Sequence, residues 1–286
     1  MARVILVGYG QMLYSLIKGI KNSHHEIVGV LRVDRLKYNK IKLFLKDVFN
    51  PSQDYTVIKA EGLWDIKANS VNSEEFLKEI DYSKPDLILV ASWGEKFKNQ
   101  VLEKVPVLNF HPSLLPKNRG ANPYFWTIYN NQKTTGLTVH FMDEKFDTGD
   151  IVAQYEIEIA PDETGYSLKN KTTMIAADVV KDILNLFEKK QLQPIKQNEM
   201  FATYEHQITS KETLIDLRKP KIDIERHFRA LYPWANPTLQ LGRRVLEFNS
   251  WEFLENLKNL RPYKVVKTSN NYIVVAGYDY LLKIYL

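Results

Sequence analysis

Short apolar runs alternate with stretches of helical spacing from residue 2 to residue 187. Residues 2–8 and 26–33 are dense in aliphatic side chains, as buried strands are, and residues 11–22 between them repeat apolar positions at the spacing of a helix face. The alternation continues along the chain, with strands predicted at 86–91, 105–109, 136–142 and 150–159 and helices at 73–80, 122–131 and 166–187. This order predicts an α/β fold with a Rossmann-like, mostly parallel sheet.

The pattern changes after the last of these helices. Residues 189–210 are polar, rich in Lys and Gln, and contain Pro194, which is typical of a linker. A short helix is then predicted at 223–231, and β-rich stretches follow at 239–248, 263–268 and 272–286. We therefore predict two domains, one at 1–204 and a small, mainly β, OB-like domain at 205–286.

Composition narrows the class of protein. With 44% hydrophobic and 12% aromatic residues, the 286-residue chain can bury sizeable cores. It contains no cysteine, which excludes disulfides, thiolate metal sites and a cysteine nucleophile. Because no apolar run approaches the ~20 residues that span a bilayer, we expect a cytoplasmic protein without a membrane partner.

The charge balance bears on the partner. The formal net charge of +5 indicates an anionic ligand, but the 39 Lys and Arg are spread among 34 Asp and Glu rather than gathered in a basic arm. Charge alone therefore does not favour nucleic-acid binding. The oligomeric state stays open, and a homodimer is one state to test.

Three polar side chains follow the predicted strands. Asn109 and His111 lie at the end of strand 105–109, two positions apart and therefore on one side of it, and Asp147 lies in the turn between the next two strands. Reactive groups of open α/β sheets collect at such strand ends. An amide donor, a titratable ring and a carboxylate suit acyl transfer to an amine: Asn109 and a protonated His111 stabilise the oxyanion, and a base, His111 or Asp147, removes a proton.

Each of these residues alone is more often a turn former or a satisfied polar group, and only the ordered combination points to catalysis. If it is correct, the His111 ring and the Asp147 carboxylate lie within ~4 Å of each other. The glycine pair Gly8 and Gly10 after the first strand does not indicate a dinucleotide, because Leu13 occupies the place of the third glycine.

These motifs resemble those of the folate-dependent formyltransferases, which include the methionyl-tRNA, glycinamide ribonucleotide and sugar N-formyltransferases. The resemblance rests on Asn-Phe-His-Pro-Ser-Leu-Leu-Pro at 109–116, Arg-Gly-Ala at 119–121, Gly-Leu-Thr-Val-His at 136–140 and Asp-Thr-Gly-Asp-Ile-Val at 147–152. It implies that 1–204 is a formyltransferase catalytic domain, that N10-formyltetrahydrofolate is the formyl donor, and that no metal takes part. It also implies that the triad consists of Asn109, His111 and Asp147.

The same resemblance indicates the folate site. In the family the pteridine lies against the loop after the strand that here spans 86–91, and against the stretch just before Asp147. The contacts expected on this basis are Ser92, Trp93, Gly94, Phe97 and Met142. For the two aromatic rings the alternative is a place in the core.

The segment 116–126 bears on the formyl acceptor, because its Asn-Arg-Gly-Ala run followed by Pro and Trp is similar to that of sugar N-formyltransferases. The implied acceptor is a nucleotide-linked aminosugar, whose diphosphate needs only a few basic side chains. The expected contacts are Tyr9, Gln11, Asn118, Arg119 and Tyr124, with Asn122 and Trp126 as further candidates.

Alternatives stay open at this point. Arg119 can instead tie its loop to the sheet, and Trp126 can be a core residue. Methionyl-tRNA formyltransferase is the alternative activity, followed by a folate-dependent hydrolase and a non-catalytic binding protein with an inherited fold.

Overall fold

The computed structural model describes residues 1–256 and 259–286, and it divides into two compact units. The first unit comprises Met1–Gly120, Thr134–Glu158 and Lys169–Tyr204. The second comprises Ala121–Lys133, Ile159–Leu168 and Glu205–Leu286. The chain therefore passes finally into the second unit after Tyr204, but two earlier segments also belong to that unit.

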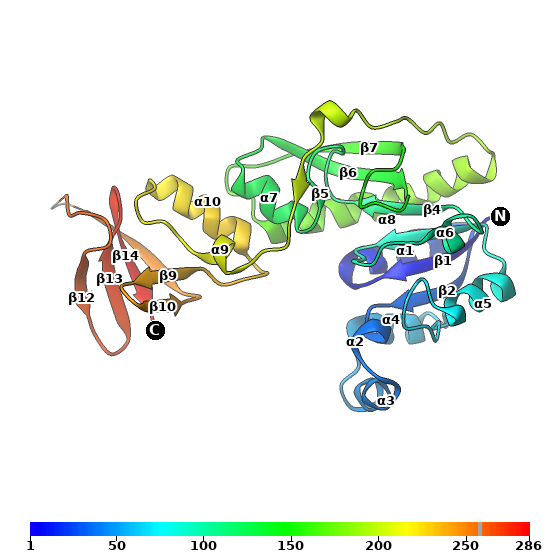
Figure 1. Cartoon of the computed structure of the whole chain (residues 1–286), viewed down its shortest axis with the longest axis horizontal. Coiled ribbons are helices and arrows are strands. Elements are labelled where there is room, and N and C mark those ends of the chain that lie inside the picture. The colour runs from blue at the N-terminus through cyan, green and yellow to red at the C-terminus, as the bar shows by residue number, and fades with distance from the viewer. Residues whose placement is uncertain (257–258) are drawn as a thin grey trace. The chain divides into compact units, whose positions relative to one another are not determined.

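The first unit is built on a six-stranded sheet in the order β2-β1-β3-β4-β6-β7 (Figure 1). Its strands are β1 (Arg3–Gly8), β2 (Glu26–Arg32), β3 (Leu87–Ala91), β4 (Val107–His111), β6 (Thr134–Phe141) and β7 (Ile151–Glu158). The first four are parallel, whereas β6 is antiparallel to β4 and β7 is antiparallel to β6. The mostly parallel α/β fold predicted from the sequence is thus confirmed.

The first unit also contains helices. They are α1 (Gly10–Lys21), α2 (Asp34–Lys37), α3 (Lys40–Phe49), α4 (Gln53–Ala60), α5 (Glu74–Ser83), α6 (Asn99–Leu102) and α8 (Gly165–Glu188), the last of which begins in the second unit. Leu16 of α1 and Val180 of α8 share one core with alternate sheet residues, and Phe76 of α5 packs in a second core on the other face. Within the described residues, no helix is long and apolar enough to cross a membrane.

Two short strands and a helical turn complete the first unit's outer loops: β5 (Arg119–Gly120), η1 (Glu199–Phe201) and β8 (Tyr204–Glu205). The backbone N–H of Arg119 donates to the carbonyl of Thr203 at 2.9 Å. The segment predicted as a linker, 189–210, is therefore hydrogen-bonded to the loop that follows β4.

The second unit combines three helices with antiparallel strands. Its elements are α7 (Pro123–Tyr129), α9 (Ser210–Thr213), α10 (Lys221–Leu231), β9 (Thr238–Leu241), β10 (Arg244–Glu247), β11 (Trp251–Glu255), β12 (Val265–Thr268), β13 (Tyr272–Ala276) and β14 (Tyr280–Tyr285). A hairpin joins β9 to β10, and four strands form a sheet in the order β11-β14-β13-β12. Phe228 of α10 packs with Phe248 and Leu282 in a core of its own. The small antiparallel β domain expected at the C-terminal end is confirmed.

Candidate active site

Three neighbouring strands of the first unit end at the same edge of the sheet. Gly8 of β1 is in register with Ala91 of β3, and Val90 of β3 is in register with Asn109 of β4. The loops that begin at Tyr9, at Ser92 and after His111 therefore leave the sheet side by side, as the rule for ligand sites in open α/β sheets requires.

The structure brings the predicted triad together. Asn109 and His111 lie on β4, and both are at most 9% exposed. The Nδ1 atom of His111 lies 3.4 Å from Oδ1 of Asp147, which meets the geometric condition set from the sequence. The amide Nδ2 of Asn109 donates to the same carboxylate oxygen at 3.2 Å.

The loop that carries Asp147 is held by backbone contacts. Asp147 adopts a φ of 57°, which is left-handed backbone that few non-glycine residues adopt. Its Oδ2 accepts a hydrogen bond from the backbone N–H of Gly120 at 2.8 Å. Gly149 passes so close to β6 that a Cβ there would lie 1.9 Å from the Phe141 carbonyl oxygen. The carboxylate is therefore fixed in place by loop geometry and by a loop that follows β4.

A glutamine from the predicted linker secures this loop further. The Nε2 atom of Gln197 donates to the carbonyl of Asp147 at 2.9 Å and to that of Gly149 at 2.7 Å. Its Oε1 accepts hydrogen bonds from the Arg119 guanidinium at 2.8 and 3.1 Å. No motif in the sequence marked Gln197, because its partners are backbone carbonyls far away along the chain.

The electrostatics of the pair follow from its burial and its neighbours. Burial alone would raise the pKa of Asp147, but the neighbouring His111 and His140 rings and the Gly120 N–H more than offset this, so the pKa is well below its usual range. Burial lowers the pKa of His111, against the opposite influence of the Asp147 charge. At neutral pH the pair is thus an ionised carboxylate beside a neutral ring.

The hydrogen bonds assign the protons of His111. Its Nε2 lies 2.9 Å from the carbonyl oxygen of Asn118, and a carbonyl only accepts, so Nε2 carries the proton. In the neutral ring Nδ1 is then unprotonated and faces Asp147. A proton delivered to Nδ1 would be stabilised at once by the carboxylate, which is the property of a general base.

His140 is a fourth polar residue of the site that sequence reasoning left without a role. It lies opposite Asn109 in the antiparallel pairing of β4 with β6, and it is fully buried. Its Nδ1 donates to the Phe141 carbonyl at 2.8 Å, so its Nε2 accepts from the Asn109 amide at 3.2 Å. The ring therefore fixes which way the Asn109 amide points. The role of His140 could have been inferred only from the pairing of β4 with β6, and the sequence motif alone does not give this pairing.

The residues expected at the folate site follow strand β3. Ser92 is exposed with a φ of 61°, and a Cβ added to Gly94 would meet nothing within 4 Å. Trp93 and Met142 are half-buried against the core under α5. Phe97 is 1% exposed and packs inside that core, so its ring has the core position that was the alternative to a folate contact. Its ring leaves no surface for a ligand.

The residues expected at the acceptor site in the first unit have different surroundings. Tyr9 is 43% exposed at the start of α1, and Gln11 donates to the Asn170 side chain at 2.9 Å. Asn118 is buried and orients His111 through its backbone carbonyl. Tyr9 and Gln11 thus lie by the loops at the carboxyl edge, whereas Asn118 is buried against His111.

Arg119 is fully buried, and all of its side-chain nitrogens contact protein groups. Its guanidinium forms a bidentate pair with Glu199 at 2.7 and 2.9 Å, donates to the Tyr204 hydroxyl at 2.6 Å, and contacts Gln197. These contacts favour the alternative role, in which Arg119 ties its loop to the rest of the unit. Contact between Arg119 and an acceptor stays a prediction.

The remaining acceptor candidates belong to the second unit. Tyr124 stacks on Trp234, with ring centroids 5.7 Å apart and planes 2° from parallel. The Asn122 side chain accepts from the backbone N–H of Ile208 at 3.1 Å. Trp126 is 9% exposed and donates to the His206 carbonyl, so it occupies the core position that was its alternative.

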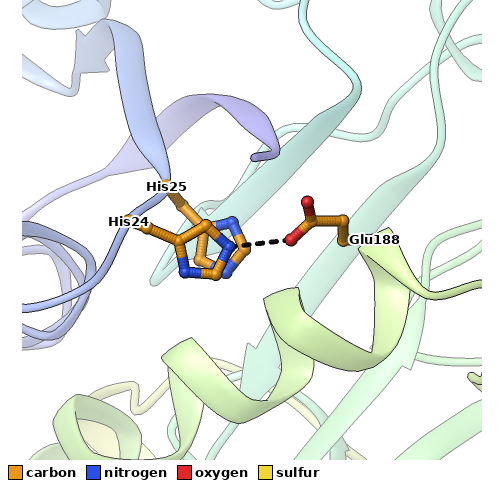
Figure 2. Close-up of side chains that lie close together, drawn as sticks. All are labelled: His24, His25 and Glu188. Carbon is orange, nitrogen blue, oxygen red and sulfur yellow. Dashed lines mark hydrogen bonds and ion pairs between the residues drawn. The ribbon is translucent and has the colours of Figure 1, made fainter.

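One group of side chains in the described residues has the composition of a metal site. Figure 2 shows His24 and His25 beside Glu188, with His24 Nε2 2.8 Å from the carboxylate. The backbone N–H of Ala2 donates to His25 Nδ1 at 3.1 Å, and His25 Nε2 lies 3.1 Å from the Asn185 side-chain oxygen. Both ring nitrogens of His25 are thus engaged, and the group lies apart from the triad. The absence of a catalytic metal stays a prediction.

Known proteins resemble this chain in sequence and in fold. The chain is 29% identical over 279 residues to a methionyl-tRNA formyltransferase from Caldanaerobacter subterraneus subsp. tengcongensis, covering 96% of this chain and 88% of that protein. Its fold matches the N-formyltransferase of Helicobacter canadensis, solved with folinic acid and dTDP-3-aminofucose, with a TM-score of 0.66 and 17% identity over 100% of this chain and 99% of that one.

A second solved fold is larger than this chain. HypX from Aquifex aeolicus, in complex with tetrahydrofolic acid, matches with a TM-score of 0.68 and 16% identity over 99% of this chain, which spans only 43% of HypX. The model of a protein family described as formyl transferase matches residues 2–184. Since this match covers well over half of the sequence and contains all three triad residues, the chain belongs to the formyl transferase family.

Proposed function

We propose that this protein transfers the formyl group of N10-formyltetrahydrofolate to the amino group of a nucleotide-linked aminosugar. The observation that carries the transfer is the buried contact between the neutral His111 ring and the ionised Asp147 carboxylate, with the Asn109 amide beside them. Together they form a base, its charged partner and a hydrogen-bond donor at one strand end, which suffices for attack of an amine on a carbonyl carbon.

The chemistry follows from the positions of these groups. As the acceptor nitrogen bonds to the formyl carbon, His111 takes a proton from the attacking nitrogen. The Asn109 amide exchanges its hydrogen bond to Asp147 for one to the oxygen that becomes negative, while its second N–H stays on His140. When the bond between the formyl carbon and the donor's N10 breaks, the His111 ring returns the proton to N10. Asp147 stabilises the protonated ring in between, so no covalent enzyme intermediate is required.

The loop after β3 has features that suit a folate. Among the described residues nothing accepts a hydrogen bond from the buried Nε1 of Trp93, and an acceptor on a bound ring would satisfy it. Gly94 leaves open space where a side chain would stand. Ser92, Trp93, Gly94 and Met142 are therefore the contacts that we propose, with Phe97 supporting them from the core.

The acceptor assignment rests on two likenesses. One is the Asn-Arg-Gly-Ala run at 118–121, and the other is the fold of the Helicobacter canadensis enzyme, which was solved with dTDP-3-aminofucose. Tyr9 and Gln11 lie beside the triad loops and are the acceptor contacts that we propose in the first unit. The methionyl-tRNA formyltransferase activity is the second candidate, because relatives with that name match nearly the whole chain.

One experiment separates the two acceptors. The purified protein is incubated with N10-formyltetrahydrofolate and either dTDP- and UDP-linked aminosugars or methionyl initiator tRNA, and the formylated product is identified by mass spectrometry. We expect N-formylated sugar nucleotide and no formylmethionyl-tRNA. Formylation of the tRNA alone would replace the acceptor proposal and keep the transfer. Release of free formate without either product would indicate a hydrolase.

A further inference from the structure

Helix α3 turns its apolar side chains toward solvent. Five of them are between 48% and 79% exposed, namely Ile41, Phe44, Leu45, Val48 and Phe49. At ~100° per residue they fall within one arc of about 140° on the helix. An amphipathic helix of a globular protein normally turns such an arc toward the core, so this exposed face requires an explanation.

The opposite side of α3 is fixed to the first unit. Leu43 is 4% exposed, and the Asp47 carboxylate accepts two hydrogen bonds, at 3.0 and 2.5 Å, from the fully buried guanidinium of Arg32. The Asn39 side chain caps the first turn by accepting from the Lys42 backbone N–H at 2.9 Å. These contacts set the rotation of the helix about its axis. Because Leu43 and Asp47 face the first unit, the apolar arc faces solvent. Figure 1 shows α3 beyond α2 and α4, away from the central sheet.

The charges around this arc have one sign. Among the described side chains of 34–60, the exposed charged ones are lysines: Lys37, Lys42 and Lys59. The carboxylates of this segment turn inward instead. Asp34 and Asp47 pair with Arg32, and Asp54 accepts from the backbone N–H of Gly10 at 2.8 Å. Of these lysines, Lys42 lies on α3 itself, ~20° beyond Phe49 at the edge of the apolar arc, and no exposed carboxylate is found among the described side chains of 34–60.

We propose that α3 is a docking surface for an anionic lipid bilayer. An apolar arc with a lysine at its edge is a pattern of helices that lie in the plane of a membrane interface, where apolar side chains enter the acyl boundary and lysine meets lipid phosphates. A helix of ten residues is too short to span, so the contact is peripheral. A second copy of the chain fits less well, because two such faces would bring two Lys42 side chains close together without exposed carboxylates of 34–60 to pair them.

Cosedimentation of the full-length protein with vesicles tests this proposal. We compare vesicles of phosphatidylcholine with vesicles that contain 30% phosphatidylglycerol, a composition of about the charge of an anionic leaflet. The test variant is Phe44→Ser with Phe49→Ser, and the matched control is Met200→Ser with Phe201→Ser, which are exposed apolar residues outside α3. A separate Lys42→Glu variant probes charge, and circular dichroism checks that each variant is folded.

We expect the natural protein to bind the anionic vesicles and not those of phosphatidylcholine alone. The affinity for anionic vesicles should be at least tenfold weaker in the Phe44/Phe49 variant, and several-fold weaker in Lys42→Glu and in 0.5 M salt. It should be unchanged in the control variant. Absence of binding to anionic vesicles would overturn the proposal. So would binding that both α3 variants leave intact. A dimer in sedimentation that the Phe44/Phe49 variant dissociates, without vesicle binding, would assign the face to a second copy. A lowered Tm in that variant, again without vesicle binding, would assign the face to a contact within the chain.

Discussion

At the scale of single residues, the site depends on three short contacts around one carboxylate. Asp147 receives hydrogen bonds from the Asn109 amide and the Gly120 N–H, and it lies beside His111. Two of these contacts come from β4 and the third comes from the backbone of β5, so the buried carboxylate is held from two separate segments.

The first prediction concerns the triad. Asp147→Asn, His111→Asn and Asn109→Ala should each lower kcat by ~10² to 10⁴. The first removes the charge that stabilises the protonated ring, the second removes the proton acceptor, and the third removes the donor to the oxyanion. Steady-state assays with saturating N10-formyltetrahydrofolate, beside melting curves, measure the effect on folded protein. Turnover near that of the natural enzyme in all three variants would refute the roles given to them.

A second prediction follows from the direction in which the pKa of His111 is shifted. Burial lowers this pKa, so the ring should titrate below its ordinary value of about 6.5. Because the unfolded chain then binds more protons than the folded one, the contribution to stability is complete above pH 6.5 and is lost as the pH falls below it. Imidazole NMR signals followed from pH 8 to 5, with His111→Gln to assign the resonance, give the midpoint. A midpoint above 6.5 would contradict the neutral-base assignment.

At the scale of elements, the segment between α8 and α9 does more than connect. Gln197 donates to two carbonyls of the loop that contains Asp147, and Arg119 donates to Gln197. We expect Gln197→Ala to lower kcat about tenfold, because the loop in which Asp147 adopts a φ of 57° loses two hydrogen bonds that hold it. The KM for folate should change little, since the substitution removes no contact with a ligand. Steady-state kinetics resolve the two constants. An increase in KM alone would instead place Gln197 in contact with a substrate.

Arg119 gives a further prediction at this scale. Its fully buried side chain donates hydrogen bonds to Glu199, Gln197 and Tyr204. Arg119→Ala should therefore lower Tm by several degrees, because it removes a buried hydrogen-bond network. The affinity for a sugar nucleotide, measured by calorimetry below the new Tm, should stay within a few-fold. A large loss of affinity at unchanged Tm would restore Arg119 to the acceptor site.

Much of the first unit was predictable from periodicity, because its strands are continuous apolar runs and its long helices bury one face. Helix α3 was missed although Ile41, Phe44 and Val48 follow the helical spacing, and the short helices α2 and α4 carry no such repeat. Asn109, His111 and Asp147 were found because they lie at a strand end and in a turn. His140 and Gln197 were missed because their roles depend on strand pairing and on contacts between distant segments.

At the scale of the whole molecule, the boundary after Tyr204 separates the units only in part. Helix α7 precedes that boundary but belongs to the second unit, where Tyr129 packs on His227 of α10 with ring centroids 5.0 Å apart. Phe125 of α7 is also fully buried. The sequence pattern does not show that this earlier helix packs with later residues.

A prediction about truncation follows. A chain that ends at Tyr204 should melt at a lower temperature than the full chain and bind the dye ANS, because removal of α10 uncovers Phe125 and Tyr129. Differential scanning fluorimetry and dye fluorescence measure both effects. In the truncated chain, Phe125→Ser should reduce dye binding. An unchanged melting temperature without dye binding would show that residues 1–204 fold alone.

The pairing of Asn109 with His140 has a consequence for how this enzyme can change over evolution. Successive residues of a strand point to opposite faces, so one residue inserted or deleted within β6 before His140 would carry its ring to the far side of the sheet. The exposed positions 144–146 in the following loop have no such constraint. Among descendants of this sequence, insertions and deletions should therefore be frequent in that loop and rare in β6.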